Sequence, residues 1–211
     1  MAVPEPPDLS VRSPLVETWA AADPMYRVHE ARFLPTQFNP TATVSRFRPF
    51  RSGGRVVSTL YAASAVPGAL FETVFREVDP EQEDQVVWRS QLVGWVRSVV
   101  VPKRDLELVS LRGAGPRRLR TTAKALTHSP SREYPATARY AEALYRWDGK
   151  ADGLLWDSGV HTGTAVVMLF GPRVRKGALA FEYDTIEPLW KGAAFEEVLS
   201  AAEAAGVTVA L

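Results

Sequence analysis

The chain has 211 residues, of which 46% are hydrophobic, and this is enough for one domain with a sizeable core. Lysine and arginine total 25 against 24 acidic residues, so the net charge of +1 gives no overall attraction to nucleic acid or membranes. The absence of cysteine excludes disulfides and thiol chemistry and fits a reducing cytoplasm.

The N-terminal segment, residues 1–24, is rich in proline and acids and then in alanine, which predicts an arm with one short helix. Its start, "MAVPEPPDLS", has neither a basic nor an apolar region, so no signal peptide is expected. No apolar run approaches the ~18 residues of a membrane span. We therefore expect a cytoplasmic protein in which residues 25–211 form a single domain.

The first part of this domain combines strands, a long loop and a helix. Residues 25–31 alternate in polarity as a strand does, and residues 33–54 are a loop rich in Pro, Gly, Ser and Thr. Loops of that length are usually functional or disordered. A β-rich strand is predicted at 55–63, followed by a helix over 65–78.

The second part adds further strands and helices in no regular order. The expected elements are strands at 90–102 and 105–110, a basic helical stretch at 116–126, a helix at 134–147, strands at 153–158 and 164–170, and a final helix and strand within 193–211. Because the order lacks a βαβ rhythm, we predict an α+β fold rather than a doubly wound sheet.

One acidic residue, Glu72, lies in the helix predicted after the second strand. The apolar stripe of that helix is formed by Leu70, Phe71, Val74, Phe75 and Val78. Glu72 lies off the centre of this stripe, and Arg76 follows four residues later. The ordinary interpretation is a solvated surface pair that contributes a few tenths of a kcal/mol.

Several short motifs accompany Glu72 in a fixed order. They are Arg27 on the first strand, "FNP" at 38–40, "SRF" at 45–47 with Arg46, "LYAA" at 60–63 with Tyr61, "ALFE" at 69–72, and "DGLLWDSG" at 152–159 with Ser158. In order and spacing, this series resembles the RES domain, a toxin family named for an Arg, a Glu and a Ser, over about residues 25–171. Two departures are Ser45, where the family usually has Gly, and the pair Trp156 and Asp157, where small residues or Pro are common.

This resemblance implies a fold like that of ADP-ribosyltransferases, with mixed, mainly antiparallel sheets and flanking helices. It also implies that NAD is a substrate whose bond between nicotinamide and ribose is broken. The ADP-ribosyl group then passes to inorganic phosphate or, as an alternative, to a protein target. The expected partner is an antitoxin of the Xre-like helix-turn-helix type, and a homodimer is left open.

The same resemblance assigns roles that suit the chemistry of each side chain. A fixed carboxylate, Glu72, stabilises an oxocarbenium-like sugar, and the guanidiniums of Arg27 and Arg46 grip a pyrophosphate. Tyr61 offers a face for stacking on nicotinamide, and Ser158 a hydroxyl for a phosphate or the acceptor. The implied catalytic set is thus Glu72, Arg46 and Ser158, and the NAD-binding set is Arg27, Arg46 and Tyr61.

Each of these residues also has a purely structural interpretation, which the sequence leaves open. Arg27 on an alternating strand can point to water, and Tyr61 can be a half-buried strand aromatic. Ser158 before a glycine suits a turn. The fourth residue, Arg46, belongs to a cluster that can form a solvated rim, together with Arg48, Arg51 and Arg55.

Other signals point to no further site. The three histidines, His29, His128 and His161, are too scattered for metal ligation, so no metal is predicted. The "GAGP" at 113–116 matches neither a Rossmann fingerprint nor a P-loop. Residues 112–124 carry five basic residues and no acid, which suits a solvated helix face, the docking of an acidic partner, or attraction of phosphates. A nucleic-acid-binding module without enzymatic activity is therefore a second class of function to test.

Overall fold

The computed structural model describes residues 3–41, 45–76, 78, 81–82, 84–161 and 163–211. Its strands are β1 (Val16–Trp19), β2 (Met25–Glu30), β3 (Phe50–Ser52), β4 (Arg55–Val57), β5 (Thr59–Ala63), β6 (Val86–Trp88), β7 (Trp95–Pro102), β8 (Leu106–Ser110), β9 (Gly153–Asp157), β10 (Ala165–Phe170), β11 (Leu179–Ala180), β12 (Glu187–Pro188) and β13 (Thr208–Ala210). Its α-helices are α1 (Val66–Phe71), α2 (Gly115–Arg118), α3 (Ala123–Thr127), α4 (Tyr134–Arg146) and α5 (Ala193–Ala205). Three short 3-10 helices are η1 (Arg89–Leu92), η2 (Ser131–Glu133) and η3 (Tyr183–Thr185).

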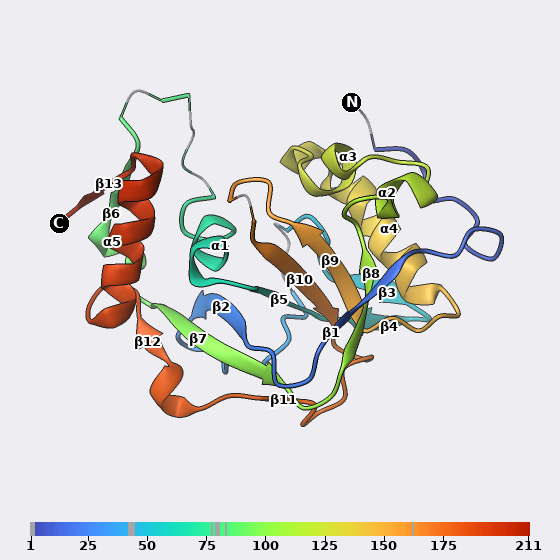
Figure 1. The fold of residues 1–211 in the computed structure, drawn as a ribbon, viewed down its shortest axis with the longest axis horizontal. Helices are drawn as coiled ribbons and strands as arrows, with labels where there is room; N and C mark the ends of the chain where they lie inside the picture. The colour runs from blue at the N-terminus through green and yellow to red at the C-terminus, as the bar shows by residue number, and fades with distance from the viewer. Residues whose placement is uncertain (1–2, 42–44, 77, 79–80, 83, 162) are drawn as a thin grey trace.

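A nine-stranded sheet forms the centre of the molecule, in the order β1-β8-β9-β10-β5-β2-β7-β11, with β12 also paired to β7. Its neighbours are antiparallel except β8 and β9, which run parallel. Two small two-stranded sheets, β13-β6 and β3-β4, flank it. In Figure 1, α5 with β6 and β13 lies at one side of the sheet, α2 to α4 lie at the other, and α1 lies between them.

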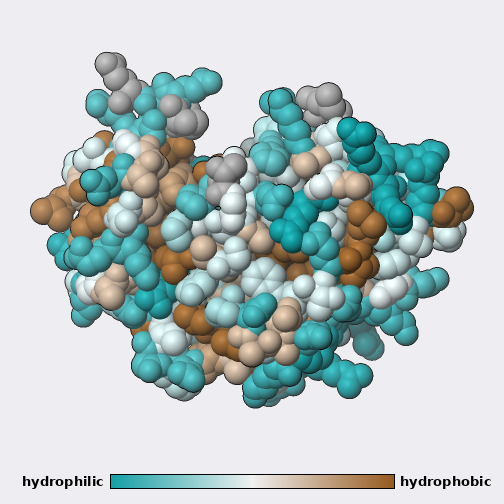
Figure 2. Space-filling model, in the orientation of Figure 1, coloured by the Kyte–Doolittle hydropathy of each residue, from teal (hydrophilic) through white to brown (hydrophobic). Residues whose placement is uncertain are grey.

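Apolar side chains cover both faces of the central sheet, because successive strand residues point to opposite faces. In β10, Val166, Met168 and Phe170 join the core beneath the helices, whereas Val167 and Leu169 join a second core on the opposite face. In β2, β5 and β9 the same alternation decides which residues can reach the helical side. The surface in Figure 2 is indented between the lobe that carries α5 and the lobe that carries α2 to α4.

The predicted α+β class is confirmed, as are the strands at 25–31, 105–110, 153–158 and 164–170 and the helix at 134–147. The loop predicted at 33–54 contains the short strand β3, and the strand predicted at 55–63 is divided into β4 and β5. Three predictions about helices were wrong. The helix expected over 65–78 ends at Phe71, the basic stretch splits into α2 and α3, and the described part of the arm holds β1 instead of a helix.

Local contacts explain these three differences. After Phe71 the chain turns back, because the amides of Thr73 and Phe75 both bond to the carbonyl of Leu70. The basic stretch breaks at Arg120, whose φ of 53° lies in the left-handed region. The arm pairs with β8 in a register from Val16↔Val109 to Trp19↔Leu106, which strand propensity alone does not disclose.

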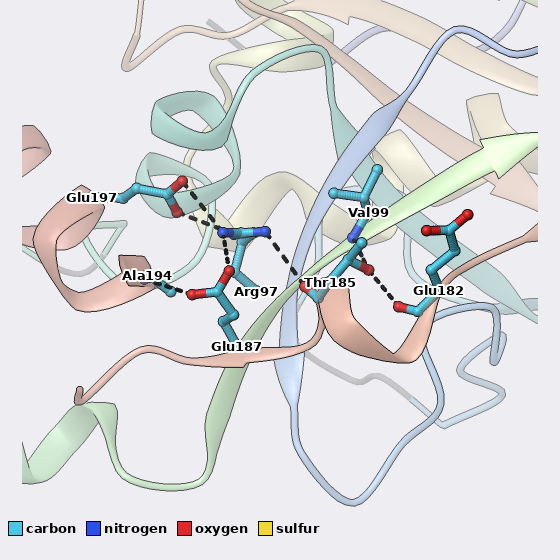
Figure 3. Close-up of polar contacts among 7 residues, drawn as sticks. All are labelled: Arg97, Val99, Glu182, Thr185, Glu187, Ala194 and Glu197. Carbon is cyan, nitrogen blue, oxygen red and sulfur yellow. Dashed lines mark hydrogen bonds and ion pairs between the residues drawn. The ribbon is translucent and has the colours of Figure 1, made fainter. Parts of the chain in front are cut away.

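A partly buried ion-pair network fixes α5 to the edge of the sheet (Figure 3). Arg97 on β7 is 8% exposed, and its guanidinium bonds to Glu187 at 2.8 Å and to Glu197 at 3.1 Å. Glu187 also accepts a bond from the amide of Ala194 in the first turn of α5. The network thus joins β7, β12 and α5 through one cation. Among the described helices, none has the length and apolar character needed to span a bilayer.

Candidate functional site

A cavity of about 170 Å³ opens on the helical face of the sheet, where strands β2, β5, β9 and β10 meet α1. Strand residues supply a largely apolar floor. Charged groups come from two other places, the turn at 45–46 and the segment that follows α1. The full lining is Tyr26, Val28, Ser45, Arg46, Tyr61, Ala62, Ala63, Ala69, Glu72, Thr73, Arg76, Trp156 and Val166.

The carboxylate of Glu72 is held in the cavity wall by Ser158. The hydroxyl of Ser158 donates to Oε1 of Glu72 at 2.9 Å, although the two residues are 86 positions apart. Oγ of Ser158 in turn accepts bonds from the amides of Val160 at 3.3 Å and His161 at 3.2 Å. Ser158 is buried and is not among the residues that line the cavity, but it contacts the lining residue Glu72.

Close packing of α1 against the sheet determines where Glu72 stands. Gly68 approaches Thr164 so closely that an added Cβ would lie 2.1 Å from Cγ2 of this buried threonine. Only glycine permits this approach, and Pro67 fixes the backbone of the first turn. Glu72 is the C-cap residue, so its position depends directly on how α1 is seated.

Tyr61 and Arg46 also line the cavity and are linked through Phe47, the residue after Arg46. The hydroxyl of Tyr61 accepts a bond from the amide of Phe47 at 3.1 Å, which anchors the turn that carries Arg46. The ring of Phe47 is fully buried and packs edge-on against Trp156. Burial raises the pKa of Tyr61 to about 12, so the phenol stays protonated at neutral pH.

Arg46 has few partners for a half-buried guanidinium. Its Nη2 makes a long 3.4 Å bond to the carbonyl of Ser129, and its Nε is buried without a partner among the described residues. Burial lowers the pKa of Arg46, while the nearby Tyr134 and Glu72 raise it and Arg76 lowers it. Glu72, Arg46 and Tyr61 thus line one cavity, and the roles that the sequence analysis gave them stay predictions.

Arg76, which the sequence suggested only as a surface partner of Glu72, also lines this cavity. Its Nη2 donates to the hydroxyl of Tyr134, the first residue of α4. The guanidinium carbon of Arg76 lies 5.4 Å from the ring centre of Tyr134, and that of Arg46 lies 5.7 Å from the same centre. The aromatic ring of Tyr134 therefore makes cation–π contacts with both guanidiniums.

Arg27 lies apart from this group. It follows Tyr26 on β2 and points to the opposite face of the sheet, because Tyr26 and Val28 are the two residues of this strand that line the cavity. Its buried Nη1 donates to the carbonyls of Leu34, Pro35 and Gln37. Burial lowers its pKa to about 10, and in this structure Arg27 holds the loop at 34–37. Its contact with NAD stays a prediction.

Three residues of this site were missed in sequence: Arg76, Trp156 and Tyr134. The cue for Arg76 was present in its spacing from Glu72, but the turn after Phe71 changes where it points. Trp156 was noted only as a departure from the family pattern, and it is 1% exposed at the cavity floor. Nothing in the sequence links Tyr134 to residues 46 and 76.

A second, more open groove adjoins the cavity at Tyr26 and runs between α1 and α5. His161 lies in it, with its ring stacked on Phe71 at 5.3 Å. Across the groove, Glu196 and Glu197 come from α5. Among the described residues, no group of three or more His, Asp and Glu side chains is placed to hold a metal ion.

Comparison with known proteins identifies the fold and the family of this chain. In fold, the chain is similar to one in the crystal structure of the M. tuberculosis MbcT-MbcA toxin-antitoxin complex, with a TM-score of 0.54, 16% identity, and coverage of 78% of this chain and 84% of that one. A search of curated proteins finds no match. The family model of the RES domain matches residues 24–191, which is most of the sequence. The chain therefore belongs to the RES domain family.

Proposed function

We propose that this protein is a toxin that consumes NAD by cleaving the bond between nicotinamide and ribose. The observation that carries the proposal is the carboxylate of Glu72, fixed by Ser158 in the wall of a cavity that also presents Arg46 and Tyr61. Membership of the RES family and the fold shared with a chain of a toxin–antitoxin complex support it.

The chemistry requires one negative charge at a fixed place. When the C–N bond to nicotinamide breaks, its electron pair stays on the ring nitrogen, which neutralises the pyridinium and leaves positive charge on the ribose. A carboxylate already oriented by a hydrogen bond stabilises that charge without reorganising. Glu72 meets this requirement, because Ser158 fixes one oxygen and leaves the other available.

Two neighbours of Glu72 suit the remainder of the substrate. The protonated phenol of Tyr61 provides a flat face for nicotinamide and a hydroxyl near the ribose. Arg46 provides donors for the pyrophosphate, since a guanidinium can form two parallel bonds to phosphate oxygens. In this proposal, Ser158 is a positioning residue for Glu72, and NAD is the substrate rather than a resident cofactor.

The acceptor in our proposal is inorganic phosphate, so the reaction is phosphorolysis. A phosphate oxygen forms the new bond to the ribose carbon that nicotinamide leaves, and the products are nicotinamide and ADP-ribose 1″-phosphate. The guanidinium of Arg46 lines the cavity and its Nε is buried without a partner among the described residues, which suits an anionic acceptor. Hydrolysis and transfer to a protein side chain are the competing routes.

A phosphate titration tests this function. Purified protein is incubated with NAD in phosphate-free buffer, phosphate is added in steps, and products are identified by mass spectrometry. We expect the rate to rise to saturation with ADP-ribose 1″-phosphate as product. A rate that ignores phosphate and yields only ADP-ribose would refute phosphorolysis, and unchanged NAD in every sample would refute NAD cleavage.

We also propose that a cognate antitoxin of the Xre-like helix-turn-helix type binds this chain and blocks the cavity. The proposal follows from the family and from the assembly in which the structurally similar chain was crystallised. Co-expression with the product of the neighbouring gene, followed by copurification and an NAD assay, tests it. Retained NAD cleavage in the purified complex would contradict it.

A further inference from the structure

We infer that Thr164 is a positioning residue for the proposed reaction, because it holds both partners of the hydrogen bond between Ser158 and Glu72. The inference rests on the proposed function and adds to it a residue that belongs to none of the sequence motifs. Thr164 lies one residue before β10, is 2% exposed, and does not line the cavity. Its contacts reach two segments that meet at the site.

The first segment is the one that carries Ser158. The carbonyl of Thr164 accepts a hydrogen bond from the amide of Ser158 at 2.9 Å. Oγ1 of Thr164 forms a second hydrogen bond, of 2.8 Å, with Nδ1 of His161. The amide of His161 in turn donates to Oγ of Ser158 at 3.2 Å. Thr164 thus fixes the serine both directly, through the backbone, and by way of His161.

The second segment is α1, which ends at the residue before Glu72. An added Cβ on Gly68 would lie 2.1 Å from Cγ2 and 2.8 Å from Cβ of Thr164, so this threonine packs directly on the backbone of the helix. The carbonyl of Gly68 accepts a bond from the amide of Glu72 at 3.0 Å. The methyl group of Thr164 therefore sets how closely the segment that carries the carboxylate approaches the sheet.

The hydrogen bond between Ser158 and Glu72 is sensitive to both contacts. It joins residues 86 positions apart, so its length depends on how their two segments pack. From 2.9 Å, a displacement of about 1 Å would take it beyond the range of a hydrogen bond. A misplacement of about 1 Å can cost about 10²-fold in rate. Because Thr164 contacts both segments, its side chain is placed to set this length.

A steric rescue tests the contact with α1. Gly68→Ala places a methyl group against Cγ2 of Thr164, which should push α1 outward and lower kcat for NAD cleavage by at least about tenfold. The double variant Gly68→Ala with Thr164→Ser lacks Cγ2, and its kcat should return to within about threefold of that of Thr164→Ser alone. The KM for NAD should change less than kcat, because the carboxylate stabilises charge that develops in the transition state.

A matched control for the clash lies at the other end of β10. A Cβ on Gly171 would lie 2.2 Å from Oγ of Ser58, so Gly171→Ala introduces a steric clash at a similar distance. Gly171 follows Phe170, the last residue of β10, and does not line the cavity. The kcat of Gly171→Ala, normalised to the folded fraction, should equal that of the wild type even where its Tm is lower.

Thr164→Val tests the contact with Ser158, because it keeps a methyl group beside Gly68 and removes the hydroxyl bonded to His161. It should lower kcat by about threefold to tenfold. Equal kcat in the wild type, Gly68→Ala and Thr164→Val would overturn the inference, as would an equal loss in Gly171→Ala. A folded double variant no faster than Gly68→Ala would also overturn it.

Crystal structures without NAD separate this inference from the proposed function. They give the distance from Oγ of Ser158 to Oε1 of Glu72 in the wild type, in Gly68→Ala and in the double variant. A distance that lengthens in Gly68→Ala and returns in the double variant, in a protein that leaves NAD intact, would show that Thr164 sets this bond and would refute the proposed function. NAD cleavage with the same distance and kcat in all three proteins would refute the positioning role and leave the function standing.

Discussion

Two arginines on the helical side of this protein, Arg97 under α5 and Arg46 in the cavity, differ in the partners that the described residues give their guanidiniums. Arg97 bonds to two carboxylates, and its exposed fraction is 8% (Figure 3). Arg46 has a long bond to a carbonyl and a buried Nε without a partner among the described residues. Arg97 is thus neutralised within the chain, whereas in our proposal Arg46 gains further acceptors from the pyrophosphate of NAD.

This difference follows from the cost of burying charge. A buried cation is tolerated when hydrogen-bonded counter-charges surround it, and such a group contributes to structure. A cation left short of acceptors raises the energy of the free protein, and such residues are typical of binding sites. Arg27 is similar to Arg97 in that acceptors within the chain take its hydrogen bonds, here backbone carbonyls instead of carboxylates. Four predictions can break or sharpen this comparison.

The largest effect is expected for Glu72→Gln, which should lower the rate of NAD cleavage by about 10²-fold or more. Glutamine keeps an oxygen for the bond from Ser158, so the Tm should stay close to that of the wild type. The measurements are nicotinamide release and thermal unfolding. Near wild-type turnover in a folded variant would remove Glu72 from the mechanism.

Arg97→Met should lower the free energy of unfolding by about 2 to 3 kcal/mol, because it leaves two carboxylates close together without their cation. We scale this figure below that of fully buried pairs, since the side chains of Glu187 and Glu197 are 29% and 36% exposed. Chemical denaturation measures the loss. An NAD affinity altered more strongly than stability would show that Arg97 is not purely structural.

His29 should make the stability of the folded protein depend on pH. Burial lowers its pKa from 6.5 to about 4, helped by the charge of Arg27, and its ring bonds to Ser98 and to the carbonyl of Glu30. In the unfolded chain His29 is protonated below about pH 6.5, whereas in the folded chain it is protonated only below about pH 4. The free energy of unfolding is therefore unaffected by His29 above pH 6.5 and decreases as the pH falls from 6.5 toward 4.

Because of His29, the free energy of unfolding should be about 2 kcal/mol lower at pH 5 than at pH 7. Urea denaturation of the wild type and His29→Gln at both values isolates the effect, since other acidic groups titrate equally in both proteins. A wild-type pH dependence that persists unchanged in His29→Gln would contradict the assignment.

The smallest effect is expected for Arg46→Lys, about a tenfold loss of NAD affinity. Lysine keeps the charge but loses the planar pair of donors that suits a pyrophosphate. Calorimetry in a Glu72→Gln background measures binding without turnover. Unchanged affinity would place Arg46 in a solvated rim, the structural alternative that the sequence leaves open.

Much of the site could be predicted because short motifs carry it. The spacing of "SRF", "LYAA" and "ALFE" identified Arg46, Tyr61 and Glu72, and the structure brings them to one cavity. Ser158 was predicted to contact a phosphate or the acceptor. In the structure it bonds to Glu72 and does not line the cavity, and its role stays a prediction. Arg27 could not be placed from sequence, because alternation on a strand defines two faces without saying which one carries the cavity.

By itself, the sequence determined the α+β class, most of the strands and the order of the motifs, because these depend on local periodicity and on residue types. Tertiary structure decided three other things: β1 joins the sheet, the helix after β5 ends at Phe71, and Tyr134 supports Arg46 and Arg76. Each depends on residues that meet across many positions of chain. Their energies come from packing and charge between distant segments, which no local pattern encodes.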